Sequence, residues 1–187
     1  MLKPILIILA VIVVLILVVL VVAAFRPSEF GVTRSATIAA PPAAVFAHVN
    51  DFKKWKAWSP WERLDPSMQR TYEGTPEGVG TIYRWVGNSQ VGSGNMTITE
   101  SRPGEAIRIA MEFIKPFASK ATAEFAFAAA GDGKTTVTWT MSGSNSNIVC
   151  KAMGLFMDMD KMVGDQFAEG LRNLAAVAEA PAAGAAQ

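Results

Sequence analysis

The chain has 187 residues, which is room for one ordinary domain and an appendage. Its formal net charge is +1 and no basic tract is present, which excludes a nucleic acid as the expected partner. Cys150 is the one cysteine and His48 the one histidine, so a disulfide within the chain and a cluster of thiolate or imidazole ligands are excluded. We therefore expect no metal and no other cofactor.

The N-terminal segment is typical of a membrane span. From Ile5 to Phe25 no side chain is charged or polar, and neither Gly nor Pro occurs. A helix of this length reaches roughly 30 Å, the thickness of the hydrocarbon core of a bilayer. A helix from a soluble core would keep a polar face, which this segment lacks. The sequence predicts an anchor over 1–26 that contacts the membrane through residues 5–25.

A cleaved signal peptide is the alternative for the same segment. Its apolar region is usually about 7–15 residues long and ends at a small-x-small site. The stretch "VVAAFRP" has no convincing A-x-A, so we favour an uncleaved single-pass anchor. Lys3 and Arg26 flank the two ends, and the positive-inside rule barely discriminates between orientations. The short N-terminal flank favours an N-terminus in the cytoplasm and a soluble part on the outer side.

The soluble part begins with a strand and short helices. After a linker at 27–29, residues 30–40 alternate as a first strand, and 41–52 predict a short helix because Pro is tolerated in a first turn. The stretch "KKWKAWSPWERLDP" (53–66) follows and holds three of the five tryptophans. Its prolines limit any helix there to a turn or two.

From residue 69 the pattern changes to period two and continues for several segments separated by short, turn-rich connections. This arrangement predicts an antiparallel meander with one wet face and one apolar face. The expected strands cover 69–74, 81–88, 92–101, 105–114, 120–129 and 134–143.

The segment 150–179 returns to a period near 3.6 and predicts one long amphipathic helix. Gly154, Gly164 and Gly170 weaken it by about 1 kcal/mol each relative to Ala. They are explained if the helix approaches the sheet closely there or must flex at the mouth of the cavity, and a place on the surface stays equally open for one or two of them. The residues 179–187 predict a disordered tail.

A strand, two short helices, a meander and a long final helix make an α+β fold of the helix-grip type. The stretches "FKKWKAWSPWERLDP", "GVGTIYRWVGN", "GSGNMTITESRPGEAIRIAMEFIKPF", "TVTWTMSG" and "MDKMVGDQFAEGLRNL" resemble the SRPBCC superfamily of START-like and polyketide-cyclase-like domains. The similarity is to its bacterial polyketide cyclase or dehydrase-like branch, and it covers 30–178. It implies a ligand-binding domain, with the anchor placing it at a bacterial inner membrane, but it specifies no chemistry.

The inward face of this fold is expected to line a cavity for a hydrophobic small molecule or lipid. Taken alone, each of its aromatic and methionine side chains is more often part of a filled core, but together they favour a cavity for an irregular apolar ligand. The candidate lining residues are Trp55, Trp58, Trp61, Tyr83, Trp85, Met96, Ile98, Ile109, Met111, Phe113, Phe125, Trp139, Met141 and Met159.

The tryptophan-rich stretch has three interpretations. Trp55, Trp58 and Trp61 form a plug that seals one end of the core, or they contact the ligand at the mouth of the cavity. Alternatively, with the neighbouring lysines, they form a lip that faces the membrane. In each interpretation the intervening charged side chains lie in solvent.

Two alternatives to simple binding remain open. A cyclase or dehydratase needs a positioned acid or base, for which Tyr83 and Glu100 are the weak candidates. Glu100 has the parity of Met96 and Ile98, so it points either into the cavity, with a raised pKa, or past its edge into water. A scaffold or regulatory domain of a membrane complex is the other alternative.

Overall fold

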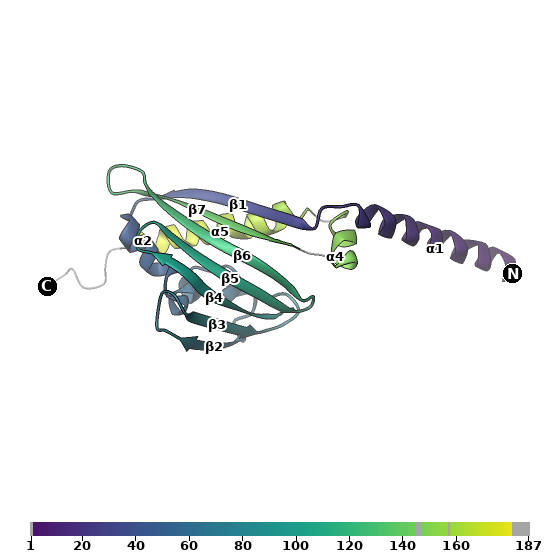
Figure 1. Ribbon diagram of the computed structural model, residues 1–187, viewed down its shortest axis with the longest axis horizontal. Helices are drawn as coiled ribbons and strands as arrows, with labels where there is room; N and C mark the ends of the chain where they lie inside the picture. The colour runs from purple at the N-terminus through teal and green to yellow at the C-terminus, as the bar shows by residue number, and fades with distance from the viewer. Residues whose placement is uncertain (1, 145–146, 157, 181–187) are drawn as a thin grey trace.

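The computed structural model describes residues 2–144, 147–156 and 158–180. Figure 1 shows a single helix, α1 (Leu2–Ala24), projecting from a domain built of a sheet and helices. The part of α1 from Lys3 to Ala24 is long and apolar enough to cross a membrane or to serve as a signal sequence. The predicted tail lies mostly outside the described residues, since 181–187 are not among them.

One antiparallel sheet forms the frame of the domain. Its strand order is β1-β7-β6-β5-β4-β3-β2, so the first strand pairs with the last strand of the meander. The meander predicted from period-two alternation is confirmed. The strands are β1 (Glu29–Ile38), β2 (Gln69–Gly74), β3 (Thr81–Val86), β4 (Ser93–Arg102), β5 (Ala106–Lys115), β6 (Ser119–Ala129) and β7 (Thr135–Ser144).

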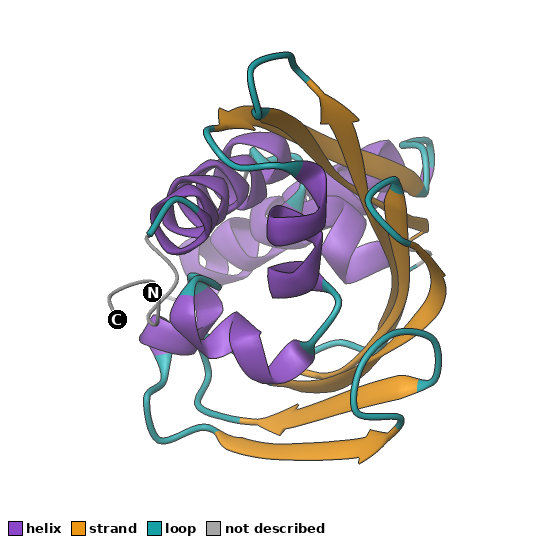
Figure 2. Ribbon diagram, turned by 90° about the vertical axis from the view of Figure 1, so that its left-hand side faces the viewer, coloured by secondary structure: helices purple, strands orange, loops and turns teal. Residues whose placement is uncertain are grey.

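The sheet curves around the helices, which all lie on its concave side apart from α1 and α4 (Figures 1 and 2). This is the predicted helix-grip arrangement. The helical elements after α1 are α2 (Pro42–Val49), η1 (Phe52–Ala57), α3 (Trp61–Leu64), α4 (Ile148–Met153) and α5 (Met159–Ala178).

The prediction of one continuous helix over 150–179 is wrong in its extent. A short helix, α4, is separated from α5 by a turn at 154–156. The reason is local, because the Asp158 side chain accepts a hydrogen bond from the Lys161 backbone N–H at 2.9 Å and caps a new helix. Of these two helices, α5 packs against the sheet and α4 packs against α1.

The two faces of the sheet differ as predicted. On the outer face, hydroxyl side chains of β1 and β7 pair across the strands at 2.9–3.2 Å, and Arg108 bridges to Glu124 at 3.0 Å. The concave face is apolar and meets α2, η1 and α5. Its fully buried side chains include Ile98, Ile107, Ile109, Phe125 and Val137.

Candidate functional site: an aromatic interior with a buried polar edge

A stack of aromatic rings fills the space between α5 and the sheet. Trp139 of β7 lies parallel to Phe167 of α5, with ring centroids 4.1 Å apart, and stacks on Phe125 of β6 at 4.7 Å. Trp58 packs edge-on against Trp139 at 5.7 Å. The rings predicted to line a cavity therefore contact one another in this structure.

Backbone hydrogen bonds hold the tryptophan-rich segment in place. The Trp55 indole N–H donates to the Val49 carbonyl at 2.9 Å, and the Trp58 indole N–H donates to the His48 carbonyl at 3.1 Å. Both rings are buried, and their N–H groups are satisfied by the end of α2. This packing matches the plug interpretation, and neither ring faces outward as a membrane lip requires. Trp61 is half-buried and covers Trp139 at 5.7 Å.

Glycines let α5 approach the sheet, as the sequence predicts for two of the three positions. A Cβ on Gly170 would lie 2.8 Å from Trp139 Cζ3, and one on Gly164 would overlap the Arg34 guanidinium. Arg34 in turn holds the start of α5 through an ion pair with Asp160 at 3.0 Å. The ring stack therefore depends on the absence of a side chain at Gly170, and the seat of the Arg34 guanidinium depends on the same absence at Gly164.

One polar atom in the stack has no partner. Trp139 is 3% exposed, and its indole N–H is the one buried side-chain polar group without a hydrogen bond among the described residues. Such a group costs about 1–3 kcal/mol. A buried donor without a partner needs an explanation, and one explanation is that a bound ligand supplies the acceptor.

A second polar feature lies at the β2–β3 edge of the same interior. Glu62 of α3 is 8% exposed and accepts a hydrogen bond from the Tyr83 hydroxyl at 2.7 Å. The Arg70 guanidinium on β2 donates to the other carboxylate oxygen at 2.6 Å. The expectation that all charges in the tryptophan-rich stretch lie in solvent is wrong for Glu62. Its partners come from two separate strands, so the sequence around Glu62 did not predict that it would be buried.

This edge holds two tyrosines in their protonated form. Burial, and then the hydrogen bond to Glu62, raise the pKa of Tyr83 far above its ordinary value. Burial, followed by the charge of Glu62, also raises the pKa of Tyr72, whose ring lies 5.3 Å from that of Tyr83. Tyr83 is thus a phenol that keeps its proton and donates it in a hydrogen bond.

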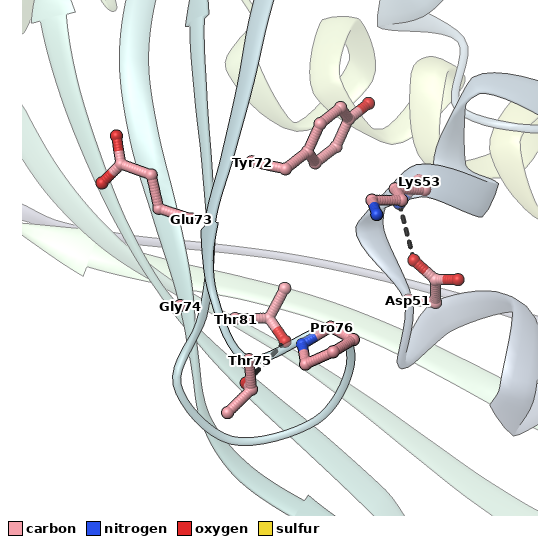
Figure 3. A pocket seen from close by; sticks show the side chains of 8 residues that line it. All are labelled: Asp51, Lys53, Tyr72, Glu73, Gly74, Thr75, Pro76 and Thr81. Atoms are coloured by element: carbon pink, nitrogen blue, oxygen red, sulfur yellow. Dashed lines mark hydrogen bonds between the residues drawn. The ribbon is translucent and has the colours of Figure 1, made fainter.

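A pocket of about 160 Å³ opens outside this edge (Figure 3). Tyr72 points across it toward the segment that carries Asp51 and Lys53, and the β2–β3 turn closes its floor. That turn needs Gly74 and Gly80, which adopt positive φ angles of 78° and 89°. Tyr72 thus lines the pocket and contacts the ring of Tyr83.

The other predicted lining residues lie on the concave face with different exposure. Trp85, Met96, Ile98 and Ile109 are buried, and Met111, Phe113 and Met141 are half-buried at the margin of the core. Met159 is the first residue of α5. Their role as ligand contacts stays a prediction.

Glu100 lies on the outer face, which decides between its two predicted positions. A β-bulge between Ile98 and Glu100 shifts the register against β5, so alternation no longer carries Glu100 inward. Its carboxylate pairs with Arg102 and Arg108, each at 3.2 Å. Tyr83 is therefore the only one of the two candidate acids that lies in the interior.

These features define a class of protein: an α+β helix-grip domain with an aromatic interior, attached to an apolar N-terminal helix. A family model described as polyketide cyclase / dehydrase and lipid transport matches residues 29–179. The chain belongs to this family, which makes it a ligand-binding or cyclase-like domain. No curated protein matches it.

Solved structures share the fold at low sequence identity. The Zhui aromatase/cyclase of Streptomyces sp. R1128 aligns with a TM-score of 0.62 and 16% identity, over 83% of this chain and 98% of that one. Protein CV1439 of Chromobacterium violaceum has a TM-score of 0.57 and 16% identity, over 83% and 100%. The di-domain ARO/CYC StfQ of the steffimycin biosynthetic pathway has 0.57 and 11%, over 81% and 51%. Such identities establish the fold alone.

Proposed function

We propose that the protein is a membrane-tethered domain that binds a hydrophobic small molecule or lipid between the sheet and α5. The ligand carries at least one hydrogen-bond acceptor, such as a carbonyl oxygen. The observation that carries the proposal is the unpaired indole N–H of Trp139 inside a stack of aromatic rings. An apolar pocket with one well-placed polar group is the usual form of a small-molecule site.

Binding requires the rings to separate, and the side chain of Trp61 is the group best placed to move, since Glu62 beside it holds α3 to Arg70 and Tyr83. Trp61 is half-buried over Trp139 and Phe167, so its displacement uncovers the stack. Few polar contacts hold this segment to α5. Arg63 meets Glu169 at 3.7 Å in solvent, and Asn173 donates to the Trp58 carbonyl at 3.1 Å.

The proposed location is a bacterial inner membrane, with the domain on the extracytoplasmic side. The apolar length of α1 supports the span. Fusions of the C-terminus to alkaline phosphatase, which is active only outside the cytoplasm, and to green fluorescent protein test this. An active phosphatase fusion is expected, and fluorescence without phosphatase activity would reverse the orientation.

Binding is tested with the full chain in lipid nanodiscs and two ligands of matched shape. Anthraquinone carries two carbonyl acceptors, and anthracene carries none. Quenching of tryptophan emission should report tighter binding of anthraquinone, by about five- to tenfold, because the Trp139 N–H gains an acceptor. Trp139→Phe should abolish this preference and keep the binding of anthracene. Equal affinities of the unmodified chain for both ligands, or no quenching beyond that of empty nanodiscs, would contradict the proposal.

An enzyme of the cyclase or dehydratase type is the second candidate, and the buried Glu62–Tyr83 pair favours it. Burial raises the pKa of the Tyr83 phenol, so Tyr83 keeps its proton and can orient the buried Glu62 carboxylate as the base of such a reaction. Tyr83→Phe removes the proton and keeps the ring. If turnover of a polyketide-like substrate is found, this variant should lower kcat while binding of the substrate persists; an unchanged kcat would remove Tyr83 from the reaction.

A further inference from the structure

Six of the ten large exposed apolar side chains outside α1, counted over the described residues, gather at one end of the domain. Strand pairing identifies this end, because Glu29 at the start of β1 pairs with Ser144, and Ser144 pairs with Lys120. The exit from α1, the tip of the β5–β6 hairpin and the approach to α4 therefore lie together, as Figure 1 shows. The large apolar side chains exposed here are Phe25, Ile114, Phe117, Ile148, Val149 and Phe156.

The helix α4 lies at the depth of the last turns of α1. Within the apolar run, Ala23 is fully buried and Val19 and Leu20 are half-buried, whereas the earlier turns are exposed. The cover comes from α4, which contacts α1. The Lys151 ammonium also donates to the Arg26 carbonyl at 2.9 Å. If α1 spans a bilayer, α4 cannot lie in bulk water.

The composition of this end suits a membrane interface. Phe25 is 87% exposed and Phe156 is 77% exposed, which is costly in water and favourable among acyl chains. The cations beside them come from three separate segments: Arg26 after α1, Lys115 at the hairpin tip and Lys151 on α4. Basic groups above apolar side chains are the usual pattern of segments that rest in an anionic headgroup layer.

We propose that α4, Phe156 and the β5–β6 hairpin tip (Ile114–Phe117) form a membrane-contact surface that rests in the headgroup layer of the bilayer that α1 spans. The inference depends on the proposed membrane tether and adds a second, peripheral contact to it. This contact fixes the orientation of the domain on the bilayer, so the domain does not rotate freely about the short connection at 25–28. The occupant of the surface is anionic phospholipid.

Spin labels measure the depth of each part of this surface in the full chain. The chain is reconstituted into vesicles of phosphatidylcholine and phosphatidylglycerol in equal parts, on a Cys150→Ser background. Labels are attached at Phe156→Cys and, independently, at Phe117→Cys. Val79→Cys is the matched control, because Val79 is an exposed apolar side chain, 54% exposed, in the turn at the opposite end of β2 and β3. Val14→Cys in the middle of α1 reports on the tether.

The accessibility of each label to oxygen, relative to a water-soluble nickel chelate, rises with depth in the bilayer. We expect this relative accessibility to be highest for the label at position 14, intermediate for the labels at 156 and 117, and lowest for the label at 79. Replacing phosphatidylglycerol with phosphatidylcholine should shift the labels at 156 and 117 toward water and leave the label at 14 unchanged. The two proposals fail differently. An aqueous label at 14 overturns the tether, whereas a deep label at 14 with aqueous labels at 156 and 117 overturns the contact surface alone. Low access to both reagents with dipolar broadening at 156 also overturns it, since a second copy of the chain then covers the site.

Discussion

Two regions of the same interior differ in whether their buried polar groups have hydrogen-bond partners. Beneath α5, the rings of Trp139, Phe125 and Phe167 form an apolar stack that leaves one indole N–H without an acceptor. At the β2–β3 edge, Glu62 is equally buried, but Arg70 and Tyr83 satisfy it. The buried polar groups of the β2–β3 edge all have hydrogen-bond partners, whereas the Trp139 indole N–H in the stack has none among the described residues. The comparison supports the proposal that a ligand binds at the stack and that the edge stabilises the fold.

The largest expected effect is the loss of the ring that closes the stack. Trp58→Ala should lower the free energy of unfolding by about 3–5 kcal/mol, because Trp58 is fully buried and its removal leaves a cavity. Urea denaturation of the full chain in nanodiscs, followed by circular dichroism, measures this. Val79→Ala, at an exposed turn, is the control and should change stability by less than about 0.5 kcal/mol. Similar values for the two variants would show that the stack is not the core.

Glu62→Gln tests the paired edge. It leaves the half-buried Arg70 guanidinium without a counter-ion, so a loss of about 3 kcal/mol is expected in the same assay. The matched control is Glu73→Gln, which breaks the ion pair with Arg84 at 3.1 Å on the surface. That pair is exposed, so its loss should cost less than about 1 kcal/mol. If both variants behave alike, the Glu62 cluster does not act as a buried unit.

High pH should weaken the same edge. The pKa of Tyr83 and that of Tyr72 are raised in the folded state, so each proton contributes stability below the ordinary pKa of about 10. That contribution is lost as the pH rises above this value, because the unfolded chain releases these protons first. Absorbance at the tyrosinate band should stay absent in the folded chain at pH values where free tyrosine ionises. Tyr83→Phe should flatten the decline of stability with pH, and an unchanged slope would contradict the assignment.

The smallest expected change in stability comes from comparing two tryptophans, one whose indole N–H has a hydrogen-bond acceptor and one whose indole N–H has none. Trp139→Phe removes a donor that has no acceptor, so part of the cost of the smaller ring is offset and the net change should be within about 1 kcal/mol. Trp55→Phe is the matched variant, since its indole N–H donates to the Val49 carbonyl at 2.9 Å. It should cost about 1–3 kcal/mol more, because a buried carbonyl loses its partner. A reversed order would mean that the Trp139 N–H has an acceptor in solution.

The amino-acid sequence alone determined the elements and their faces. Period-two alternation in "TIYRWV" and "KTTVTWTM" marks a sheet with one wet face, and the apolar run from Ile5 to Phe25 marks α1. These signals are local, since each follows from the geometry of a few consecutive residues. The helix-grip order was predictable from the order of these elements, whereas the close approach at Gly164 and Gly170 was one of several alternatives that the sequence left open.

Tertiary structure decided which polar groups are buried and which are paired. Glu62 lies in a charged stretch. Its burial depends on Arg70 and Tyr83, which come from β2 and β3, two paired strands that follow Glu62 in the chain. Glu100 faces outward because a bulge against β5 cancels its parity. The separation of α4 from α5 places α4 on α1, a contact between residues far apart in the sequence. Burial and hydrogen bonding depend on which distant segments meet, and no pattern along a single segment encodes that.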